Sequence, residues 1–349
     1  MLTSFPPSSR KFGHASPAPD LALGHSWHNF LDYLGPPVSF SDGITVLVSG
    51  DIYDDDGIAS TPTTLIADLY RSDQLHKIAW LNGSFCIAIF DPLKNRVALI
   101  TDRLASRSVF VWHDNKRLLA SSRLLPLIRE KIVPKKLSRQ GIAELLVFQR
   151  TIASHTQYED IVSMPAAQVW TWEKGKLEKK TSRKLSWTKP DFSKSEAAEG
   201  LAAALVRATA RRISGSARHG LLMSGGLDSR TVLAAARKAG LSLGCATVGA
   251  WDNAEVGLAR KSSGISNVPF KLHYCNADTL GSAIRPSTIA SDGLFSAPIN
   301  LFPCLSEIAE DYDVMLSGHG LDYTLRGYYL PCRTLRLAGS VTRLPMLRK

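Results

Sequence analysis

The segment that decides the fold is HGLLMSGGLDSRTVLAAARKAG, residues 219–240 of the 349-residue chain. Residues 220–223 form a short apolar run, which is typical of a strand buried on both faces. A glycine loop follows, and apolar residues then recur at helical spacing up to Gly240, where a helix C-terminal cap belongs. A strand, a glycine loop and a helix in this order predict a phosphate-binding site.

The chemistry of the loop explains this prediction. Two adjacent glycines, Gly225 and Gly226, let the backbone pass close to an anion, and the helix N-terminus directs N–H groups and a positive dipole end at it. Asp228 would lie beside the phosphates, so we expect a bridging cation, most simply Mg²⁺. The Gly-Lys-Ser/Thr of a Walker A loop is missing. The residues instead resemble the SGGxDS pyrophosphate loop of enzymes that release AMP and pyrophosphate, and the alternative is a plain glycine turn with a helix cap.

Length and composition favour a soluble, cytoplasmic protein of about two domains. Apolar residues make up 44% of the chain, enough for sizeable cores, and the net charge of +11 is scattered rather than concentrated, so it is weak support for an anionic partner. The five cysteines are widely spaced, which argues against a zinc knuckle or a disulfide framework. No signal peptide and no apolar run of roughly 18 residues is present, so we expect no membrane span.

The order of patterns along the chain predicts an α/β protein with two domains. We expect residues 1–25 to be poorly ordered, a β-rich domain over residues 26–185, and an alternating β/α domain over residues 186–349 with a parallel sheet. Specific expectations are a helix opened by Pro62, a helix from Ser138 to Arg150, a hairpin around Gly175, and a linker over residues 179–194. Three helix caps are also expected, at Thr61, at Ser193 with Glu196, and at Asp252 with Glu255.

A second glycine loop ends the last predicted strand, at residues 313–316. It runs through Ser317, Gly318 and His319 to Asp322. Because loops at the carboxyl ends of parallel strands meet where ligands bind, we expect Asp228 and Asp322 to face one nucleotide and share its Mg²⁺. Taken alone, this second loop is more often a plain turn.

Several further motifs now indicate a family. They are GDIY at residues 50–53, LNGSF at 81–85 with Asp91 and the pair Asp102-Arg103, Ser121-Ser122, TQYEDIVSMP at 156–165, and ATVG at 246–249. Together with the two loops, they resemble the asparagine synthetase family over nearly the whole chain. The resemblance implies an N-terminal α+β amidotransferase-like β-sandwich of the N-terminal-nucleophile type. It also implies a parallel-sheet ATP-pyrophosphatase domain, similar to the adenine nucleotide α-hydrolases.

The resemblance also implies the reaction and the site. It implies an ATP-dependent ligase that adenylates a small-molecule or peptide carboxylate and transfers ammonia or an amine, with ATP and Mg²⁺ as cofactors. Asp228 and Asp322 would hold Mg²⁺. The remaining positions implied in the ATP site are Leu222, Ser224, Gly225, Gly226, Leu227, Ser229, Val248, Ser317 and Gly318. Of these, Leu222, Val248 and Gly318 would border AMP, and Ser224, Gly225, Gly226 and Ser229 would hold pyrophosphate.

Three features depart from the family pattern. The family's glutaminase uses an N-terminal cysteine, but no cysteine precedes Cys86, so we expect no glutaminase activity. Relatives without it, such as β-lactam synthetases and lasso-peptide cyclases, use an amine on the substrate. His319 replaces a glutamate beside the phosphates, which puts selectivity for aspartate in doubt. The segment after Tyr329 is expected to be the start of a truncated domain or a basic tail.

Two other functions stay open at this stage. One is a nucleotide-binding pseudoenzyme or fragment without catalysis, and the other is a tRNA-modifying relative suggested by the basic charge. Paired cysteines and a basic-aromatic cluster are both missing from the sequence, so nucleic acid is the weakest partner. The sequence leaves a homodimer open.

Overall fold

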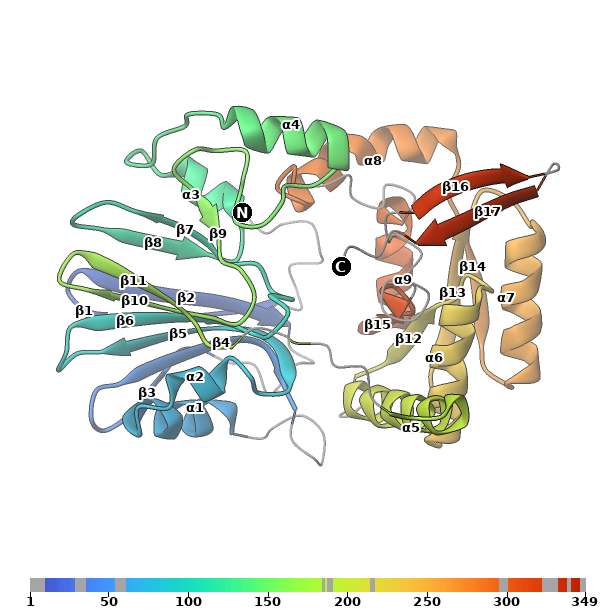
Figure 1. The fold of residues 1–349 in the computed structure, drawn as a ribbon, viewed down its shortest axis with the longest axis horizontal. Helices are drawn as coiled ribbons and strands as arrows, with labels where there is room; N and C mark the ends of the chain where they lie inside the picture. Colours follow the sequence, from blue (N-terminus) through green and yellow to red (C-terminus); the bar gives the residue numbers. More distant parts are fainter. Residues whose placement is uncertain are drawn as a thin grey trace. The chain divides into compact units, whose positions relative to one another are not determined.

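The computed structural model describes residues 10–28, 36–53, 61–183, 186, 191–213, 217–294, 301–321, 332–337 and 340–345. The chain forms two compact units. Unit 1 comprises Met1–Ala197, Arg211–Ala217 and Cys275–Ser306, and unit 2 comprises Ala198–Ala210, Arg218–Tyr274 and Glu307–Lys349. Antiparallel sheets build the first unit and a parallel sheet builds the second (Figure 1), so the predicted mixed α/β class is confirmed.

Unit 1 contains a six-stranded and a three-stranded antiparallel sheet. The larger sheet has the order β11 (Lys176–Thr181), β10 (Gln168–Glu173), β6 (Arg96–Thr101), β5 (Gly83–Asp91), β4 (Thr45–Ile52) and β3 (Val38–Ser39). The smaller sheet has the order β8 (Leu118–Ser121), β7 (Phe110–His113) and β9 (Val162–Ser163). The segments between these strands contain the described helices α1 (Pro62–Arg71), α2 (Leu75–Ile78), α3 (Leu124–Arg129) and α4 (Arg139–Phe148).

The unit is layered as helix, sheet, sheet and helix. One face of the large sheet packs on α1 and α2 through buried residues that include Val46, Ile66 and Ile89. Its other face packs on the small sheet through residues that include Val111 and Trp170, and the far side of the small sheet packs on α3. Strand β5 is therefore covered on both faces, as its continuous apolar run predicts.

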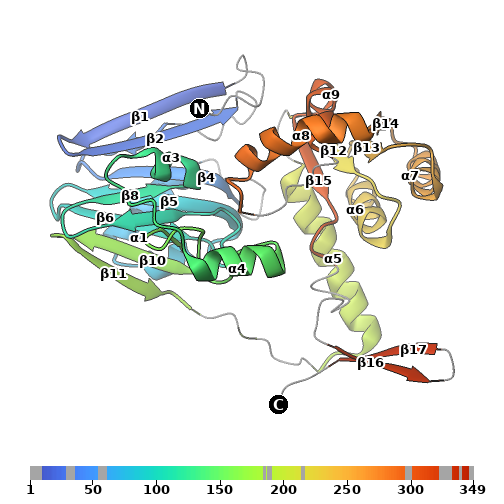
Figure 2. The ribbon, with the colours of Figure 1, turned by 90° about the horizontal axis from the view of Figure 1, so that it is seen from above.

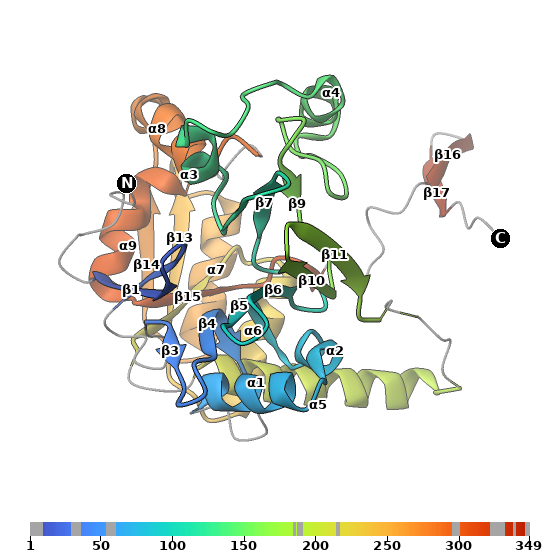
Figure 3. The same cartoon turned by 90° about the vertical axis from the view of Figure 1, so that its left-hand side faces the viewer.

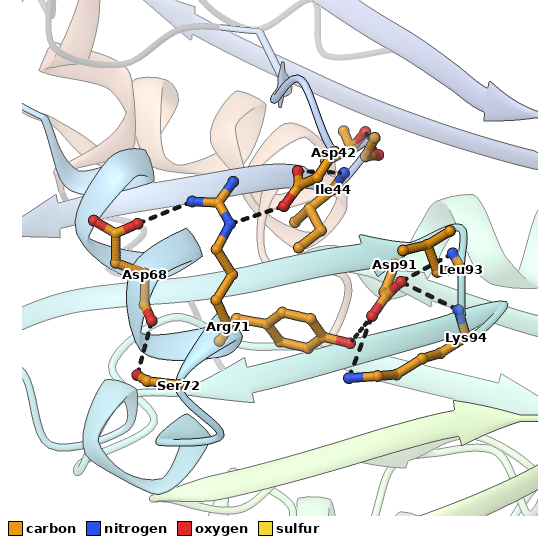
Figure 4. Close-up of polar contacts among 11 residues, drawn as sticks. Asp42, Ile44, Asp68, Arg71, Ser72, Asp91, Leu93 and Lys94 are labelled. Carbon is orange, nitrogen blue, oxygen red and sulfur yellow. Dashed lines mark hydrogen bonds and ion pairs between the residues drawn. The ribbon is translucent and has the colours of Figure 1, made fainter.

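Polar contacts fasten α1 to the large sheet (Figure 4). Arg71 Nε donates to Asp42 Oδ2, in the turn before β4, at 2.8 Å, and its Nη1 donates to Asp68 Oδ1 within α1 at 2.9 Å. Tyr70 Oη donates to the buried carboxylate of Asp91 at 2.8 Å. Pro62 opens the helix as predicted, but the side chain of Thr61 makes no capping hydrogen bond.

Several local predictions hold and others shift by a few residues. Lys174 and Gly175 both have positive φ in the turn of the predicted β10–β11 hairpin. Ser138 caps α4 by accepting from Gly141 N–H at 3.1 Å. That helix ends at Phe148, before the predicted Arg150, because Gln149 adopts a left-handed φ of 58°.

The N-terminal segment differs from the prediction. Residues 1–25 were expected to be poorly ordered, but residues 10–28 form an antiparallel hairpin of β1 (Arg10–Ala18) and β2 (Leu21–His28), in which Leu23 is buried. This segment is rich in Pro and Ser, which are not typical strand residues, so the sequence did not indicate a pair of strands here. Residues 1–9 lie outside the described part.

Unit 2 contains a four-stranded parallel sheet, as predicted. Its order is β14 (Phe270–Tyr274), β13 (Gly244–Gly249), β12 (His219–Leu222) and β15 (Val314–Ser317). The helices along this part of the chain are α5 (Lys194–Arg212), α6 (Leu227–Lys238), α7 (Ala254–Ile265) and α9 (Leu305–Asp311). The capping box of α5 is confirmed, because Ser193 N–H donates to Glu196 Oε2 at 2.8 Å and Glu196 N–H donates to Ser193 Oγ at 3.2 Å.

The helices divide between the two faces of this sheet. Figures 2 and 3 show α6 and α7 along one face and α9 along the other. On the α7 face, the Arg260 guanidinium carbon lies over the ring of Phe270, 5.6 Å from its centroid. On the α9 face, Lys271 Nζ donates to Asp311 Oδ2 at 2.7 Å and His273 Nδ1 lies 2.9 Å from Glu307 Oε2. The alternation of strand β14 therefore places its basic residues on the side of the acidic helix.

Four elements complete the described chain. In unit 1, α8 (Ala277–Ala290) and the short 3₁₀ helix η2 (Phe302–Cys304) follow β14. At the C-terminal end, β16 (Cys332–Leu337) and β17 (Ser340–Pro345) pair as an antiparallel hairpin, where the sequence predicted a truncated domain or a basic tail. No helix among the described residues is long and apolar enough to cross a membrane.

Candidate functional site

The order of strands in unit 2 places two loops at one point of the sheet. From β12 the chain moves to β13 and then to β14 on one side, whereas β15 lies on the other side of β12. Such a reversal creates a crevice at the carboxyl ends of the two strands that flank it, here β12 and β15, and ligands of open parallel sheets bind there. The loops at residues 223–226 and 317–320 leave β12 and β15 at this crevice.

The second loop contacts the start of α6, which follows the first loop. Gly318 is buried against the backbone of that first helical turn, and a Cβ placed on it would lie 2.7 Å from Asp228 C and from Ser229 N. No side chain fits into that space, so glycine is required at position 318. The structure thus brings together Gly318, Asp228 and Ser229, which were expected to share a site although 90 positions of sequence separate the two segments.

Hydrogen bonds inside the first loop fix its shape. Ser224 N–H donates to Ser229 Oγ at 3.3 Å, the two hydroxyl oxygens lie 3.1 Å apart, and Gly226 N–H donates to Ser224 Oγ at 3.3 Å. Gly225 has a φ of +71°, and a Cβ on it would meet Leu258 Cβ at 2.8 Å and Glu255 O at 2.9 Å. The loop therefore rests on the first two turns of α7.

The start of α6 leaves N–H donors available. Its N-cap is Gly226, which has no side chain to accept from the first turn, whereas Asn253 Oδ1 accepts from Val256 N–H at 3.1 Å at the start of α7. The first N–H groups of a helix need acceptors, and an anion at the N-terminus supplies them. Asp228 lies half-buried in this first turn and Leu227 is exposed.

The N-cap of α7 differs from the prediction. Asp252 was expected to cap α7, but the cap is Asn253, one residue later. The carboxylate of Asp252 instead pairs with Arg260 Nη1 at 2.8 Å, with both side chains about half exposed. Sequence spacing could not separate two neighbouring residues that are both good caps.

The other predicted positions surround the crevice. Leu222 ends β12 and Val248 lies near the end of β13, both half-buried, and Thr247 Oγ1 ties the two strands by donating to Met223 O at 2.6 Å. Ser317 is exposed and its Oγ accepts from His319 N–H at 3.0 Å.

The proposed metal ligands are only partly described. Asp322 lies outside the described residues. In the described ranges, no three His, Cys, Asp or Glu residues gather into a group that could hold a metal ion. Of the two predicted metal ligands, the structure therefore describes Asp228, in the first turn of α6.

Unit 1 contains a cavity of about 660 Å³ that sequence reasoning did not predict. It is bounded by the β1–β2 hairpin, the end of β4 and α3, and its polar lining includes His14, His25, Ser49, Ser122, Arg123 and Arg129. The nearby thiol of Cys86 is buried, and burial raises its pKa to about 11. A thiol of that pKa stays protonated near neutral pH, so Cys86 is a poor nucleophile.

A second unpredicted feature is an ion pair within unit 1. Arg123 donates from Nε and Nη2 to the two carboxylate oxygens of Asp292, at 2.7 and 2.8 Å, and Leu124 N–H adds a third bond at 2.9 Å. The Asp292 side chain is 4% exposed. Gln157 Nε2 donates to the neighbouring Gly293 O at 2.7 Å. These bonds hold the segment after α8 to α3, and no periodic pattern connects residues that lie 169 positions apart.

Comparison with known proteins agrees with both halves of the chain. The model of the glutamine amidotransferase domain matches residues 22–183, and the asparagine synthase model matches residues 200–348. A protein of Methanocaldococcus jannaschii, named "Putative asparagine synthetase (glutamine-hydrolyzing) 2", is 24% identical over 182 residues. That alignment covers 51% of this chain and 35% of the archaeal protein, so the match spans about a third of the relative's length.

The class of protein follows from these findings. An antiparallel, amidotransferase-like part precedes a parallel sheet with a glycine loop at its switch point, and each part matches its own family model. The chain belongs to the asparagine synthetase family.

Proposed function

We propose that this protein is an ATP-dependent ligase that activates a carboxylate as its adenylate, releases pyrophosphate, and joins the acyl group to ammonia or an amine. The observation that carries the proposal is the contact of Gly318 with Asp228 and Ser229 at the switch point of the parallel sheet. The family match supports the same class of carbon–nitrogen bond formation.

The residues of the crevice fit a triphosphate with its magnesium ion. In this proposal the first N–H groups of α6 and the hydroxyls of Ser224 and Ser229 hold pyrophosphate. Asp228, with Asp322 as its proposed partner, holds Mg²⁺, since carboxylates are the ligands this ion takes when phosphates supply the rest. Leu222, Val248 and Gly318 then border AMP.

The reaction divides into two displacements. A carboxylate oxygen of the substrate attacks the α-phosphorus, and the bond to the oxygen that bridges to the β-phosphorus breaks, so pyrophosphate leaves with that electron pair. The nitrogen lone pair then attacks the acyl carbon, AMP leaves with the electrons of the carbon–oxygen bond, and the amine proton passes to solvent. The protein contributes by positioning and by offsetting negative charge with the α6 donors.

The proposal extends to the organisation of the chain. We assign residues 26–185 to an amidotransferase-like sandwich and residues 186–349 to the ATP-pyrophosphatase part. The layered sheets of unit 1 and the parallel sheet of unit 2 support this division. Since Cys86 is buried with a raised pKa, we propose that this thiol takes no part in supplying nitrogen.

Product analysis tests the reaction. The full chain is incubated with Mg²⁺ and ATP labelled at the α-phosphate, together with L-aspartate or one of a panel of amino-acid and peptide carboxylates. We expect AMP and pyrophosphate in equal amounts with at least one carboxylate. We also expect Asp228→Ala to lower the rate by roughly 10²-fold, the scale of one lost electrostatic contact.

A matched control separates the site from the surface. Glu310→Ala removes an exposed carboxylate of α9 in the same unit and should keep the wild-type rate. Wild-type rates in Asp228→Ala, or release of ADP instead of AMP, would contradict the proposal. Tight binding of ATP·Mg²⁺ without AMP from any carboxylate would also contradict it and would indicate a nucleotide-binding protein without catalysis.

A further inference from the structure

Two large aromatic side chains are exposed at the carboxyl edge of the parallel sheet. Trp251 is 66% exposed two residues after the end of β13, and Tyr274, the last residue of β14, is 64% exposed. The register pairs Tyr274 with Gly249, so both aromatic residues belong to the same edge of the sheet. Large aromatic side chains are mostly buried in folded proteins, and exposed ones are enriched where a ligand binds.

The backbone that carries Trp251 is held at both ends. Before it, β13 ends at Gly249, and after it Asn253 caps α7 through a bond of 3.1 Å to Val256 N–H. Between them, Asp252 pairs with Arg260 at 2.8 Å. The exposure of Trp251 therefore belongs to a short connection tied to a strand and a capped helix.

The same helix supports the phosphate loop. Gly225 lies against Glu255, Leu258 and Ala259 in the first two turns of α7. Trp251 precedes these turns by only a few residues, so the connection that carries it and the glycine loop are fixed to one helix end. Both therefore face the carboxyl edge of β12 and β13.

The geometry of the crevice sets the direction of the nucleoside. On the β15 side, Gly318 closes directly onto Asp228 and Ser229. On the other side, β13 lies next to β12 at the usual strand spacing of about 4.8 Å. A nucleoside whose phosphates lie at the start of α6 can extend across the end of β13, where Trp251 is exposed.

We propose that Trp251 stacks its indole face on the base of the bound nucleotide and so favours purine over pyrimidine triphosphates. This inference rests on the proposed function, because it takes the phosphates to bind at the glycine loop. The strength of stacking on an indole depends on the area of the flat base and not on its hydrogen-bonding groups. The larger purine ring system therefore gains more than a pyrimidine.

Binding measurements with the full chain test the inference. Isothermal titration is carried out with ATP·Mg²⁺, CTP·Mg²⁺ and pyrophosphate·Mg²⁺ on the wild type, Trp251→Ala and Trp251→Phe. We expect Trp251→Ala to raise the Kd for ATP about tenfold, within the range measured for loss of a base–aromatic stack. Trp251→Phe should raise it less than threefold, and pyrophosphate should bind all three proteins equally.

A control on the same helix excludes a general effect on folding. Ile265 is 78% exposed at the far end of α7, so Ile265→Ala should leave every Kd unchanged. An unchanged Kd for ATP in Trp251→Ala, or an equal loss for pyrophosphate, would overturn the role of Trp251 and leave the proposed function intact. Failure of the wild type to bind ATP or pyrophosphate would overturn both.

Discussion

At the scale of single residues, Gly318 sets how closely the two loops of unit 2 approach each other. Its missing side chain lets the second loop rest directly on the backbone of Asp228 and Ser229. Gly225 has the corresponding role on the other side of the first loop, where a positive φ and the contact with α7 both require glycine. The crevice therefore depends on backbone packing as much as on its functional side chains.

Gly318→Ala should impair nucleotide binding without unfolding the protein. The added Cβ would lie 2.7 Å from two backbone atoms in the first turn of α6, so either the second loop or the start of α6 has to shift. We expect the Kd for ATP·Mg²⁺ to rise at least about tenfold, since phosphate donors placed wrongly by an ångström lose most of their effect. Isothermal titration measures the change.

Gly257→Ala is the control for that substitution. Gly257 lies within α7, and among the described residues a Cβ placed on it meets no heavy atom within 4 Å apart from the neighbouring residues and backbone of its own helix. This variant should bind ATP like the wild type and gain roughly 0.5–1 kcal/mol of stability from helix propensity. Equal affinities in the two variants would show that the contact of the loops is irrelevant to binding.

The residue scale also shows where sequence reasoning succeeds. The strand, the glycine turn and the helix follow one another as predicted, because that pattern is local, but the helix begins at Leu227, so Asp228 lies in its first turn and not in the loop before it. The partnership of Arg123 and Asp292 could not be predicted, since it joins residues that only the fold brings together. Asp322, the second predicted metal ligand, lies outside the described residues and remains a prediction.

At the scale of elements, ion pairs fasten α9 and the turn that follows it to the sheet. Lys271 and His273 are two residues apart in β14 and so lie on the same face of the sheet. Lys271 bonds to Asp311 and His273 bonds to Glu307, and these two acidic residues are one helical turn apart in α9. Just after the helix, Asp313 accepts from Arg218 side-chain and backbone donors at the start of β12. Strand β15 begins directly after Asp313 and leads into the second loop of the crevice, so these contacts position that loop.

The pair at Asp313 should make stability depend on pH. Side-chain donors of Arg218 lower the pKa of Asp313 below its usual value, burial opposes the shift, and the backbone N–H of Arg218 supports it. A lowered folded-state pKa stabilises the protein above the unfolded pKa of about 3.9, and the contribution is lost as the pH falls through the folded pKa.

The comparison with Asp313→Asn measures this contribution. Because Arg218 is about half exposed, we expect the variant to be less stable by only about 1 kcal/mol at pH 7. The difference between the two proteins in urea unfolding should shrink below about pH 4. A difference that stays constant from pH 7 to pH 2.5 would contradict this assignment.

Burial should decide the strength of two otherwise similar ion pairs. The Asp292 carboxylate is 4% exposed and bonded to Arg123, whereas the Asp252 carboxylate is 50% exposed and bonded to Arg260. We expect Asp292→Asn to cost about 2–3 kcal/mol, because it leaves a poorly solvated guanidinium without its counter-charge. Asp252→Asn should change stability by less than about 0.5 kcal/mol.

Urea unfolding of both variants at pH 7 tests this contrast. The two substitutions are chemically identical, so any difference between them reports the environment of the carboxylate. Equal losses in the two variants, or a smaller loss in Asp292→Asn, would show that the bonds between α3 and the segment after α8 contribute little.

At the scale of the whole molecule, the alternation of strands and helices predicts the parallel sheet of unit 2 well. Short apolar strands separated by polar turns likewise predict the antiparallel sheets of unit 1. The N-terminal hairpin was missed because Pro and Ser hide its alternation. The grouping of Cys275–Ser306 with unit 1 was missed because it depends on long-range bonds such as Arg123–Asp292.

The central claim is that the crevice between β12 and β15 binds ATP through its phosphates. A crystal structure of the full chain with Mg²⁺ and a non-hydrolysable ATP analogue tests it most directly. The account predicts phosphate oxygens within hydrogen-bond distance of the first N–H groups of α6, with the cation beside Asp228. A nucleotide bound elsewhere, such as in the cavity beside the β1–β2 hairpin, with the α6 N-terminus unoccupied, would contradict it.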